Sequence, residues 1–600
     1  MRNCTIIATR YDKNKNDATR LKQKDMAVLL NISESRLLSY TSGTSTLPLL
    51  GITIGDMFDQ TAARFPNNDA LVVPHQNMRL TYKVLKKLVD NCAKAFLALG
   101  VRKGDRVGIW APNRYEWTVT QFATAKIGAI LTNINPSYRL HELEYALNHS
   151  ACSVLVTAVQ FKTSHFTDML FALAPELNTS KKGHLKSAKV PQLNTIIQMG
   201  TDEKNGMWRW DDFMKQAKKT TTADLEKCQN ALAFDEPINI QYTSGTTGFP
   251  KGATLSHHNI LNNGYFVAKT MNFTDKDRLI IPVPLYHCFG MVLGNLGCMT
   301  HGATMIYPSE GFDPVAVLEA ADREKATAIY GVPTMFIAEL DLPNFNQYTL
   351  TSLRTGIMAG SPCPIEVMKK VQSLMHVTEM GIGYGMTETS PISTQTRIGT
   401  PLEKQVSTVG QVHPHIEAKI IDPETGFTVP LGAAGEFCSR GYCVMLGYWN
   451  NEKATQSSID AARWMHSGDL ATMDEEGYIK IVGRIKDMII RGGENIYPRE
   501  IEEFLYTHPK ISDVQVIGVP DAKYGEAVMA WVRLKEGETI SLEEVRAFCI
   551  DQITHFKTPQ YIRITDRFPM TVTGKIRKVE MREISIRELG LEVVSKIITA

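Results

Sequence analysis

The sequence has little net charge and no cysteine pattern typical of a metal site or a disulfide framework. The formal net charge of its 600 residues is only +2, which leaves no overall field to hold nucleic acid or an anionic membrane surface non-specifically. Ten cysteines are present, but no two of them form a Cys-x-x-Cys pair. We therefore expect reduced, mostly buried thiols in a reducing compartment, and no nucleic-acid partner.

Charged residues are absent from one long stretch, residues 279–309. Its length would permit a membrane span, but three prolines and four glycines interrupt any apolar helix of about 20 residues. We expect a buried loop and helix beside a pocket, and no transmembrane segment.

The first forty residues lack the apolar core of a secretory signal and hold eight basic and four acidic side chains. A mitochondrial presequence is half matched, because the four acids interrupt the acid-poor pattern of such segments. We expect residues 1–50 to be an N-terminal extension and a candidate targeting segment. Mitochondrial and cytoplasmic locations both stay open at this point.

The pattern that is present is that of an α/β protein. Apolar residues make up 43% and charged residues 21% of the chain, which are ordinary globular values. From about residue 52, stretches of helical period alternate with short apolar runs, as in stacked βαβ units. One helix is expected over residues 82–99, with a buried strand over 106–110. The polar segment 178–190 is expected to be a solvated loop.

Three further strands are expected at residues 238–242, 353–358 and 380–384, each running into a Gly- or Thr-rich turn where ligands gather in open α/β sheets. After residue 483 the pattern becomes α+β, with strands over 514–519, 528–534 and 561–564 and a helix that a capping box opens at Ser541. The expected domains are the extension 1–50, a large domain 51–483 and a small domain 484–600, with the boundary near residues 483–487.

A loop after the strand at 238–242 combines hydroxyls, glycines and a lysine. Glycines let backbone N–H groups face a ligand, hydroxyls donate to phosphate oxygens and lysine adds a mobile cation, so the loop predicts a polyphosphate cradle. It is not a Walker loop, because proline stands at position 250 and glycine follows the lysine. A flexible turn is the alternative. The loop comprises Thr243, Ser244, Gly245, Thr246, Thr247, Gly248, Phe249, Pro250 and Lys251.

A second candidate site lies at residues 384–389. The preceding glycines do not complete a dinucleotide fingerprint, because Met386 occupies the third glycine position. The aromatic ring, two hydroxyls and the carboxylate of Glu388 could instead stack on a base and hold a hard cation through oxygen. In isolation, Glu388 would more often be an exposed surface acid.

These motifs, with residues 466–470, 483–487 and 573–575, stand in the order found in the adenylate-forming superfamily of acyl-CoA synthetases, luciferases and peptide-synthetase adenylation domains. The sequence resembles that superfamily from about Gly51 onward. Residues 284–288, 440–449 and 489–498 resemble its mitochondrial medium-chain acyl-CoA synthetases in particular. The resemblance implies a large AMP-binding domain of stacked α/β subdomains and a small, mobile α+β C-terminal domain.

The resemblance also implies an AMP-forming acid–thiol ligase that uses ATP, Mg²⁺ and coenzyme A. Lys575 resembles the catalytic lysine, which contacts the carboxylate and the α-phosphate. Lys251 resembles a phosphate-binding cation, and Glu388 resembles the magnesium ligand. His287 and His257 resemble residues beside the acyl pocket, although a lone histidine is more often structural.

Further residues match the family's nucleotide and coenzyme positions. Asp469 and Arg484 resemble the pair that holds the ribose hydroxyls, and Lys486 stands at the hinge, with Asp487 as the other pivot. Two glycines would leave a slot for the pantetheine arm. The remaining nucleotide residues are Gly360, Ser361, Tyr384, Gly385 and Thr387, and the slot glycines are Gly492 and Gly493.

The acid is expected to be a fatty acid, with medium length suggested by the resemblance. Amino-acid-adenylating relatives place an aspartate where residues 279–309 have no carboxylate, so an ammonium-bearing substrate would be rejected. An aromatic-acid CoA ligase, a luciferase-like adenylating enzyme and a non-catalytic binding protein of the same fold stay open. The apolar lining would come from Leu285, Phe289, Met291, Val292 and Leu293.

Overall fold

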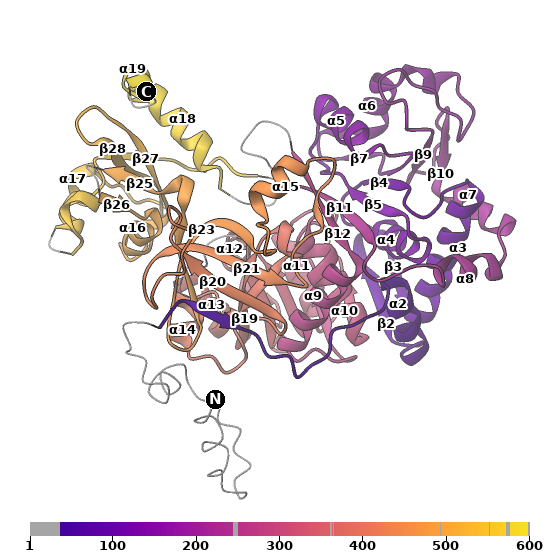
Figure 1. The fold of residues 1–600 in the computed structure, drawn as a ribbon, viewed down its shortest axis with the longest axis horizontal. Helices are drawn as coiled ribbons and strands as arrows, with labels where there is room; N and C mark the ends of the chain where they lie inside the picture. Colours follow the sequence, from indigo (N-terminus) through magenta and orange to yellow (C-terminus); the bar gives the residue numbers. More distant parts are fainter. Residues whose placement is uncertain are drawn as a thin grey trace, which may run out of the picture.

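The computed structural model describes residues 37–243, 250–360, 363, 365–491, 494–550, 552–571 and 576–597 (Figure 1). These residues form a large unit with three extensive sheets and a small unit at one end of the molecule. The predicted α/β class, with a large N-terminal and a small C-terminal domain, is confirmed.

The first large sheet has eight strands and is parallel from β10 to β11, whereas its last two strands run antiparallel. In spatial order they are β10 (Met207–Arg209), β9 (Thr195–Gln198), β6 (Val154–Thr157), β4 (Arg106–Trp110), β5 (Ile130–Asn133), β11 (Pro237–Thr243), β12 (Lys251–Ser256) and β22 (Gly447–Tyr448). A short hairpin consists of β7 (Gln160–Phe161) and β8 (Ser164–His165).

The helix expected over 82–99 is confirmed as α3. The strand expected after it, over 106–110, is confirmed as β4. The Thr81 hydroxyl accepts a hydrogen bond from the Val84 amide and so caps α3. Of the predicted loop 178–190, residues 179–190 have no helix or strand, whereas Asn178 ends the short 3-10 helix η4 (Pro175–Asn178). The helices are α2 (Ile54–Arg64), α3 (Tyr82–Ala98), α4 (Tyr115–Ile127), α5 (Leu140–Ser150), α6 (Phe166–Leu173), α7 (Trp210–Lys215), α8 (Thr222–Gln229) and α9 (His257–Thr270).

The second large sheet has nine strands, with a parallel centre from β17 to β2. In spatial order they are β19 (Gln411–Val412), β18 (Ile392–Gln395), β17 (Glu379–Gly385), β16 (Thr355–Ala359), β15 (Ala328–Gly331), β13 (Arg278–Ile280), β14 (Thr304–Ile306), β2 (Asp69–Val73) and β3 (Met78–Thr81). The strands expected at 238–242, 353–358 and 380–384 are confirmed as β11, β16 and β17. The associated helices are α10 (Gly297–His301), α11 (Pro314–Arg323), α12 (Pro333–Leu340), α13 (Ile365–Leu374) and α14 (Leu402–Ser407).

A third, antiparallel sheet joins distant parts of the chain, because its first strand comes from the beginning of the described residues (Figure 1). Its strands are β1 (Tyr40–Ser42), β20 (Ile416–Ile421), β21 (Gly435–Gly441), β23 (Met465–Met473) and β24 (Ile479–Arg484). Helix α15 (Glu452–Ser458) precedes β23.

The small domain follows β24 and the short helix η9 (Ile485–Asp487). The boundary predicted near residues 483–487 coincides with η9, and the exact limits of the domains stay a prediction. Its expected strands are confirmed as β27, β28 and β29, and Ser541 caps α17 by accepting from the Glu544 amide. The second half of the expected capping box is not seen, since the Glu544 carboxylate pairs with Lys510 at 2.7 Å. The elements are β25 (Ile489–Arg491), β26 (Glu494–Ile496), β27 (Ile511–Asp521), β28 (Gly525–Leu534), β29 (Tyr561–Ile564), α16 (Pro498–Leu505), α17 (Leu542–Cys549), α18 (Lys578–Glu588) and α19 (Glu592–Ile597).

The uncharged segment 279–309 folds as expected into buried loop and helix. Between β13 and β14 it forms a π-helix, η6 (Phe289–Leu296), that continues into α10. A Cβ on Gly290 would lie 2.5 Å from the Pro284 carbonyl oxygen, so the close approach of helix and loop requires glycine there. Within the described ranges no helix combines the length and the apolar character needed to cross a membrane.

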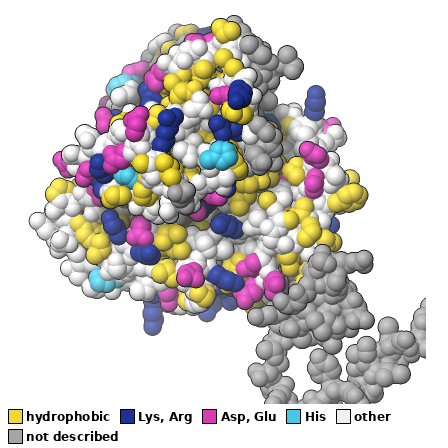
Figure 2. All heavy atoms as spheres, turned by 90° about the vertical axis from the view of Figure 1, so that its left-hand side faces the viewer, with side chains coloured by type: hydrophobic (Ala, Val, Ile, Leu, Met, Phe, Trp, Pro, Cys, Tyr) yellow, Lys and Arg dark blue, Asp and Glu magenta, His cyan; other side chains and the backbone are white. Residues whose placement is uncertain are grey.

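The surface and the thiols also agree with the composition. On the face shown in Figure 2, basic and acidic side chains are interspersed rather than separated into fields of one sign. None of the nine cysteines among the described residues forms a disulfide, and all except the half-buried Cys228 are buried. Cys4 lies outside the described residues.

Candidate active site

Glu388 lies at the junction of the two large sheets. It belongs to the single-turn helix η8 (Thr387–Thr389) directly after β17, and its side chain is buried, with 6% of the residue exposed. The Tyr448 hydroxyl of β22 donates to Glu388 Oε1 at 2.7 Å, and Thr243 Oγ1 of β11 lies 3.5 Å from the same oxygen. Among the described residues, no hydrogen bond to Glu388 Oε2 is recorded. The prediction of a functional acid is therefore favoured over that of an exposed surface acid.

Lys251 begins β12, opposite Thr243 at the end of β11, so the candidate phosphate loop connects two antiparallel strands. The Lys251 ammonium lies over the Tyr448 ring, 5.0 Å from its centre. The hydroxyl of the same tyrosine is the one that donates to Glu388. Burial, followed by the Glu388 charge, raises the pKa of Tyr448, which keeps its hydroxyl protonated as a donor. Tyr448 thus brings the predicted cation and the predicted metal ligand together.

A second cluster forms around Asp469, which is 8% exposed. Arg484 faces it across β23 and β24, with 2.9 Å between Arg484 Nε and Asp469 Oδ1. The Tyr384 hydroxyl donates to Asp469 Oδ2 at 2.7 Å. Burial works to lower the pKa of Arg484, but the carboxylates of Asp469 and Asp487 outweigh it, so that pKa is raised. The family resemblance assigned these three residues to one nucleotide site, and in the structure their side chains are in contact.

Gly360 follows β16, Gly385 ends the adjacent parallel strand β17 and Thr387 lies just beyond it, so all three lie at one edge of the sheet. Gly360 has a φ of +91°, and a Cβ on Gly385 would lie 1.8 Å from the Pro391 carbonyl oxygen. Both positions therefore require glycine. Thr387 is buried.

The loop before the π-helix contributes a buried polar cluster. The Cys288 thiol donates to Gln241 Oε1 at 3.1 Å, and burial, with a smaller contribution from Glu388, raises its pKa. His287 Nδ1 accepts from the Phe289 amide at 3.2 Å, which fixes the ring against the start of the helix. Neither contact assigns a catalytic role to His287, which stays a prediction.

His257 is 1% exposed, and its Nδ1 accepts from the Ile54 amide at the start of α2 at 3.2 Å. Burial lowers its pKa to about 4, so the ring is neutral. These contacts favour a structural role for His257.

Several predicted residues lie outside the described ones, and their roles stay predictions. Lys486 is described and lies in η9, directly after Arg484. Pro250, also described, precedes β12, and its carbonyl accepts from the Tyr145 hydroxyl at 3.2 Å. The residues outside are Ser244, Gly245, Thr246, Thr247, Gly248, Phe249, Ser361, Gly492, Gly493 and Lys575.

Sequence reasoning assigned no role to Tyr448 and Gln241. Tyr448 stands in the run 440–449, which carries part of the resemblance, but nothing in its residue type indicates which carboxylate it binds. Gln241 alternates with apolar neighbours on a buried strand. A buried amide in such a strand is an available signal, because a buried polar group needs a partner.

Comparison with known proteins identifies the family. The AMP-binding enzyme family matches residues 58–449, and the AMP-binding enzyme C-terminal domain matches residues 500–575. The chain belongs to the AMP-binding enzyme family. In this AMP-binding enzyme the partners of Glu388 come from β11 and β22, and the partners of Asp469 come from β17 and β24.

Two relatives match this AMP-binding enzyme over almost their whole length. YngI of Bacillus subtilis, which bears the name of an acyl-CoA synthetase, is 50% identical over 90% of this chain and 99% of its own. The mitochondrial medium-chain acyl-CoA ligase ACSF2 of Danio rerio is 47% identical over 92% of this chain and 91% of its own. Among solved structures, the anthranilate CoA ligase AuaEII in complex with anthranoyl-AMP matches with a TM-score of 0.78 and 25% identity, over 90% of this chain and 98% of its own.

Proposed function

We propose that the protein is an ATP-dependent acyl-CoA synthetase. It joins a carboxylic acid to the α-phosphate of ATP, releasing pyrophosphate, and then transfers the acyl group to coenzyme A, releasing AMP. The observation that carries this function is the pair of clusters at the end of β17, Glu388 with Lys251 beside Tyr448 and Tyr384 with the Asp469–Arg484 pair, in a chain 47% identical to a medium-chain acyl-CoA ligase.

In the first half-reaction two anions must approach each other, so fixed positive charge is needed where negative charge builds up. Lys251 and Lys575 supply it at the phosphates, with Lys575 between the carboxylate and the α-phosphate. Asp469 accepts from the ribose hydroxyls, and Arg484 and Tyr384 hold its carboxylate in place. The Tyr384 ring and Gly360 border the adenine.

The environment of Glu388 fits a magnesium ion. Its carboxylate is buried, two hydroxyl groups lie on Oε1, and oxygen ligands suit a hard cation. Glu388 would hold Mg²⁺, with Thr243 as a neighbouring oxygen donor. When bound, the ion would neutralise phosphate charge. The chain's own contribution is to keep the carboxylate oriented and screened from water.

For the second half-reaction the small domain rotates about Lys486. The rotation withdraws Lys575 and brings Gly492 and Gly493 to the site, where the absence of side chains admits the pantetheine arm. The family's two-domain organisation supports this step.

The acid is a medium-chain fatty acid. The residues expected to line its pocket are all buried, and the ring centre of one of them, Phe289, lies 5.4 Å from that of Tyr330. Segment 279–309 offers an apolar surface without a carboxylate to pair an ammonium group. ACSF2 of Danio rerio is named as a medium-chain ligase.

The proposed location is the mitochondrial matrix, which the name of the zebrafish relative supports, whereas YngI comes from a bacterium. Residues 1–36 lie outside the described ones. Imaging a fluorescent fusion with and without residues 1–50 tests the location, and unchanged cytoplasmic signal in both would contradict it.

The test of function is acid-dependent exchange of labelled pyrophosphate into ATP, followed by coenzyme A-dependent release of AMP. Octanoate, anthranilate, coumarate and alanine should be compared. Octanoate should be preferred, and a preference for anthranilate or coumarate would move the protein to the aromatic-acid ligases, a class that the match to AuaEII brings into the panel. Exchange with none of a broad set of acids would contradict the enzyme function and favour a binding protein.

A further inference from the structure

Strand β23 bulges away from β21 over the three residues that end with Asp469, the carboxylate assigned to the ribose. Cys438 of β21 pairs with His466 of β23, and Glu436 of β21 pairs with Leu470 of β23. Between these two pairs, the three residues 467–469 of β23 lie opposite one residue of β21, Phe437. Such a bulge interrupts the ladder of backbone hydrogen bonds. Its last residue is the ribose carboxylate, so the position of that carboxylate depends on what holds the bulge.

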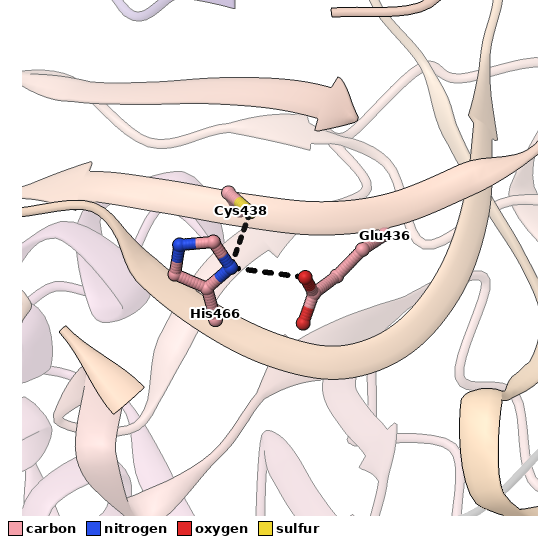
Figure 3. A group of neighbouring side chains, drawn as sticks. All are labelled: Glu436, Cys438 and His466. Carbon is pink, nitrogen blue, oxygen red and sulfur yellow. Dashed lines mark hydrogen bonds and ion pairs between the residues drawn. The ribbon is translucent and has the colours of Figure 1, made fainter. Parts of the chain in front are cut away.

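The carboxylate of Glu436 connects the residue before the bulge to the middle of the bulge. Its Oε1 accepts from the Gly468 amide at 2.9 Å, and its Oε2 lies 2.9 Å from Nδ1 of His466 (Figure 3). Ser467 Oγ donates to a β21 carbonyl at 2.7 Å and accepts from the Asp469 amide at 3.0 Å. One carboxylate therefore ties the residue before the bulge to the bulge itself.

The charges around His466 favour its protonated form. The hydrogen bond and the charge of Glu436 raise the pKa of His466, and Asp460, whose Oδ2 lies 3.9 Å from Nε2, acts in the same direction. Burial and the ammonium of Lys419 act in the opposite direction but are outweighed. The imidazolium and the carboxylate thus form a charge-assisted pair over a wider pH range than a free histidine would allow.

A metal ion is the other ligand that this cluster suggests, because the candidate atoms of Glu436, Cys438 and His466 lie within 4.8 Å of one another. His466 Nδ1 faces both neighbours, at 2.9 Å from the carboxylate and 3.6 Å from the sulfur, and is already hydrogen-bonded. Burial raises the pKa of the Cys438 thiol, and Lys419 adds positive charge nearby. The cluster is therefore better described as a hydrogen-bonded group than as a metal site.

We propose that Glu436 and His466 are positioning residues that fix the bulge and so present Asp469 to the ribose of ATP. This inference rests on the proposed function. Because protonation of His466 strengthens the bridge, its contribution to ATP affinity is complete at low pH and declines as pH rises through the raised pKa of His466.

The first test is the equilibrium dissociation constant of ATP in the Glu436→Gln variant of the full chain. Gln keeps the shape of the side chain but removes the charge, so ATP should bind about tenfold more weakly. Turnover at saturating ATP should stay within about twofold of the unmodified protein. The matched control is Glu417→Gln on β20, whose carboxylate pairs with Arg440 at 2.7 Å, away from the bulge, and which should leave ATP affinity unchanged.

The second test is the pH dependence of ATP affinity in His466→Gln, which keeps a neutral hydrogen-bonding side chain. The dissociation constant relative to the unmodified protein should be about tenfold higher at pH 6 and approach equality at pH 9. Comparison at each pH cancels the titration of ATP itself. A ratio that does not vary with pH would overturn the role of the imidazolium, and thermal unfolding of each variant identifies a loss that is only structural.

The possible failures are separable. If the unmodified protein binds no ATP, the proposed function fails. If it binds ATP and supports pyrophosphate exchange while Glu436→Gln binds ATP equally well, only the positioning role fails. Equilibrium dialysis against Zn²⁺ tests the metal alternative. If the protein retains Zn²⁺ and Cys438→Ala abolishes that retention, the description as a hydrogen-bonded group is wrong. If the protein retains no Zn²⁺ through Cys438, that description is supported.

Discussion

Replacing Tyr448 by Phe tests whether Glu388 acts through a metal ion. The substitution removes only the hydroxyl that donates to Glu388 Oε1 at 2.7 Å, and it keeps the ring near the Lys251 ammonium. A hydrogen bond to a charged group contributes about 1.5–3 kcal/mol, and the buried carboxylate has no solvent to replace it. Loss of a partner that orients a metal ligand typically lowers metal affinity or activity 10- to 100-fold.

The assay is acid-dependent pyrophosphate exchange at fixed ATP as the concentration of free Mg²⁺ is varied. The half-saturating Mg²⁺ concentration should rise about 10- to 100-fold in Tyr448→Phe, with much of the rate restored at saturating Mg²⁺. Tyr40→Phe is the matched control, because the Tyr40 hydroxyl also donates to a glutamate at 2.7 Å, but on the exposed surface. It should change nothing measurable.

The opposite pattern would refute this reasoning. If Tyr448→Phe lowers the maximal rate but leaves the Mg²⁺ dependence unchanged, Tyr448 does not act through a metal ion on Glu388. Equal effects of both Tyr→Phe variants would show that burial of the Glu388 pair has no functional consequence.

Three further predictions follow from the site and the thiols. Lys575→Ala should slow adenylate formation about 10²- to 10³-fold in single-turnover measurements but spare thioester formation from supplied acyl-adenylate. Gly493→Leu should instead slow thioester formation and spare adenylate formation. Equal losses in both steps would contradict the rotation of the small domain. Across straight-chain acids from acetate to palmitate, kcat/KM should rise about fourfold per methylene and fall beyond medium length, and a preference for acetate or alanine would argue against an apolar pocket. Among the described cysteines, Cys228 should react first with iodoacetamide in peptide mapping, because it alone is half-buried; early labelling of Cys288 would indicate an open site.

Local patterns in the sequence were sufficient to predict much of the fold. Helix α3 and strands β4, β11 and β17 follow from apolar periodicity and from flanking turns, and each is found within about two residues of its expected limits. The pairing of β1 with β20 could not be predicted this way, since it joins residues more than 370 positions apart. The π-helix was also missed, because a buried apolar run does not distinguish one helix type from another.

The residue types of the site were predicted, but their partners were not. Glu388 stands out as an acid in a Gly- and Thr-rich turn after a strand, whereas Asp469 and Arg484 were assigned by resemblance alone. The Tyr448 hydroxyl reaches Glu388 from a strand 60 residues further along the chain, and no local pattern encodes that contact. The bulge beside Glu436 was likewise not predictable, because it depends on the register between two strands.

Arg484 pairs with Asp469, the carboxylate proposed to bind the ribose, and is also the last residue of β24, directly before the η9 segment that contains Lys486. Arg484 falls at the first position of the predicted small domain, 484–600, but it pairs with Asp469 in the third sheet. If the small domain turns about Lys486, two residues further on, Arg484 stays with that sheet in both orientations. The nucleotide can keep its sugar contacts while the chemistry around its phosphate changes. An acyl-adenylate formed in the first orientation would then stay bound until coenzyme A arrives, so a reactive anhydride is not exposed to hydrolysis between the two steps.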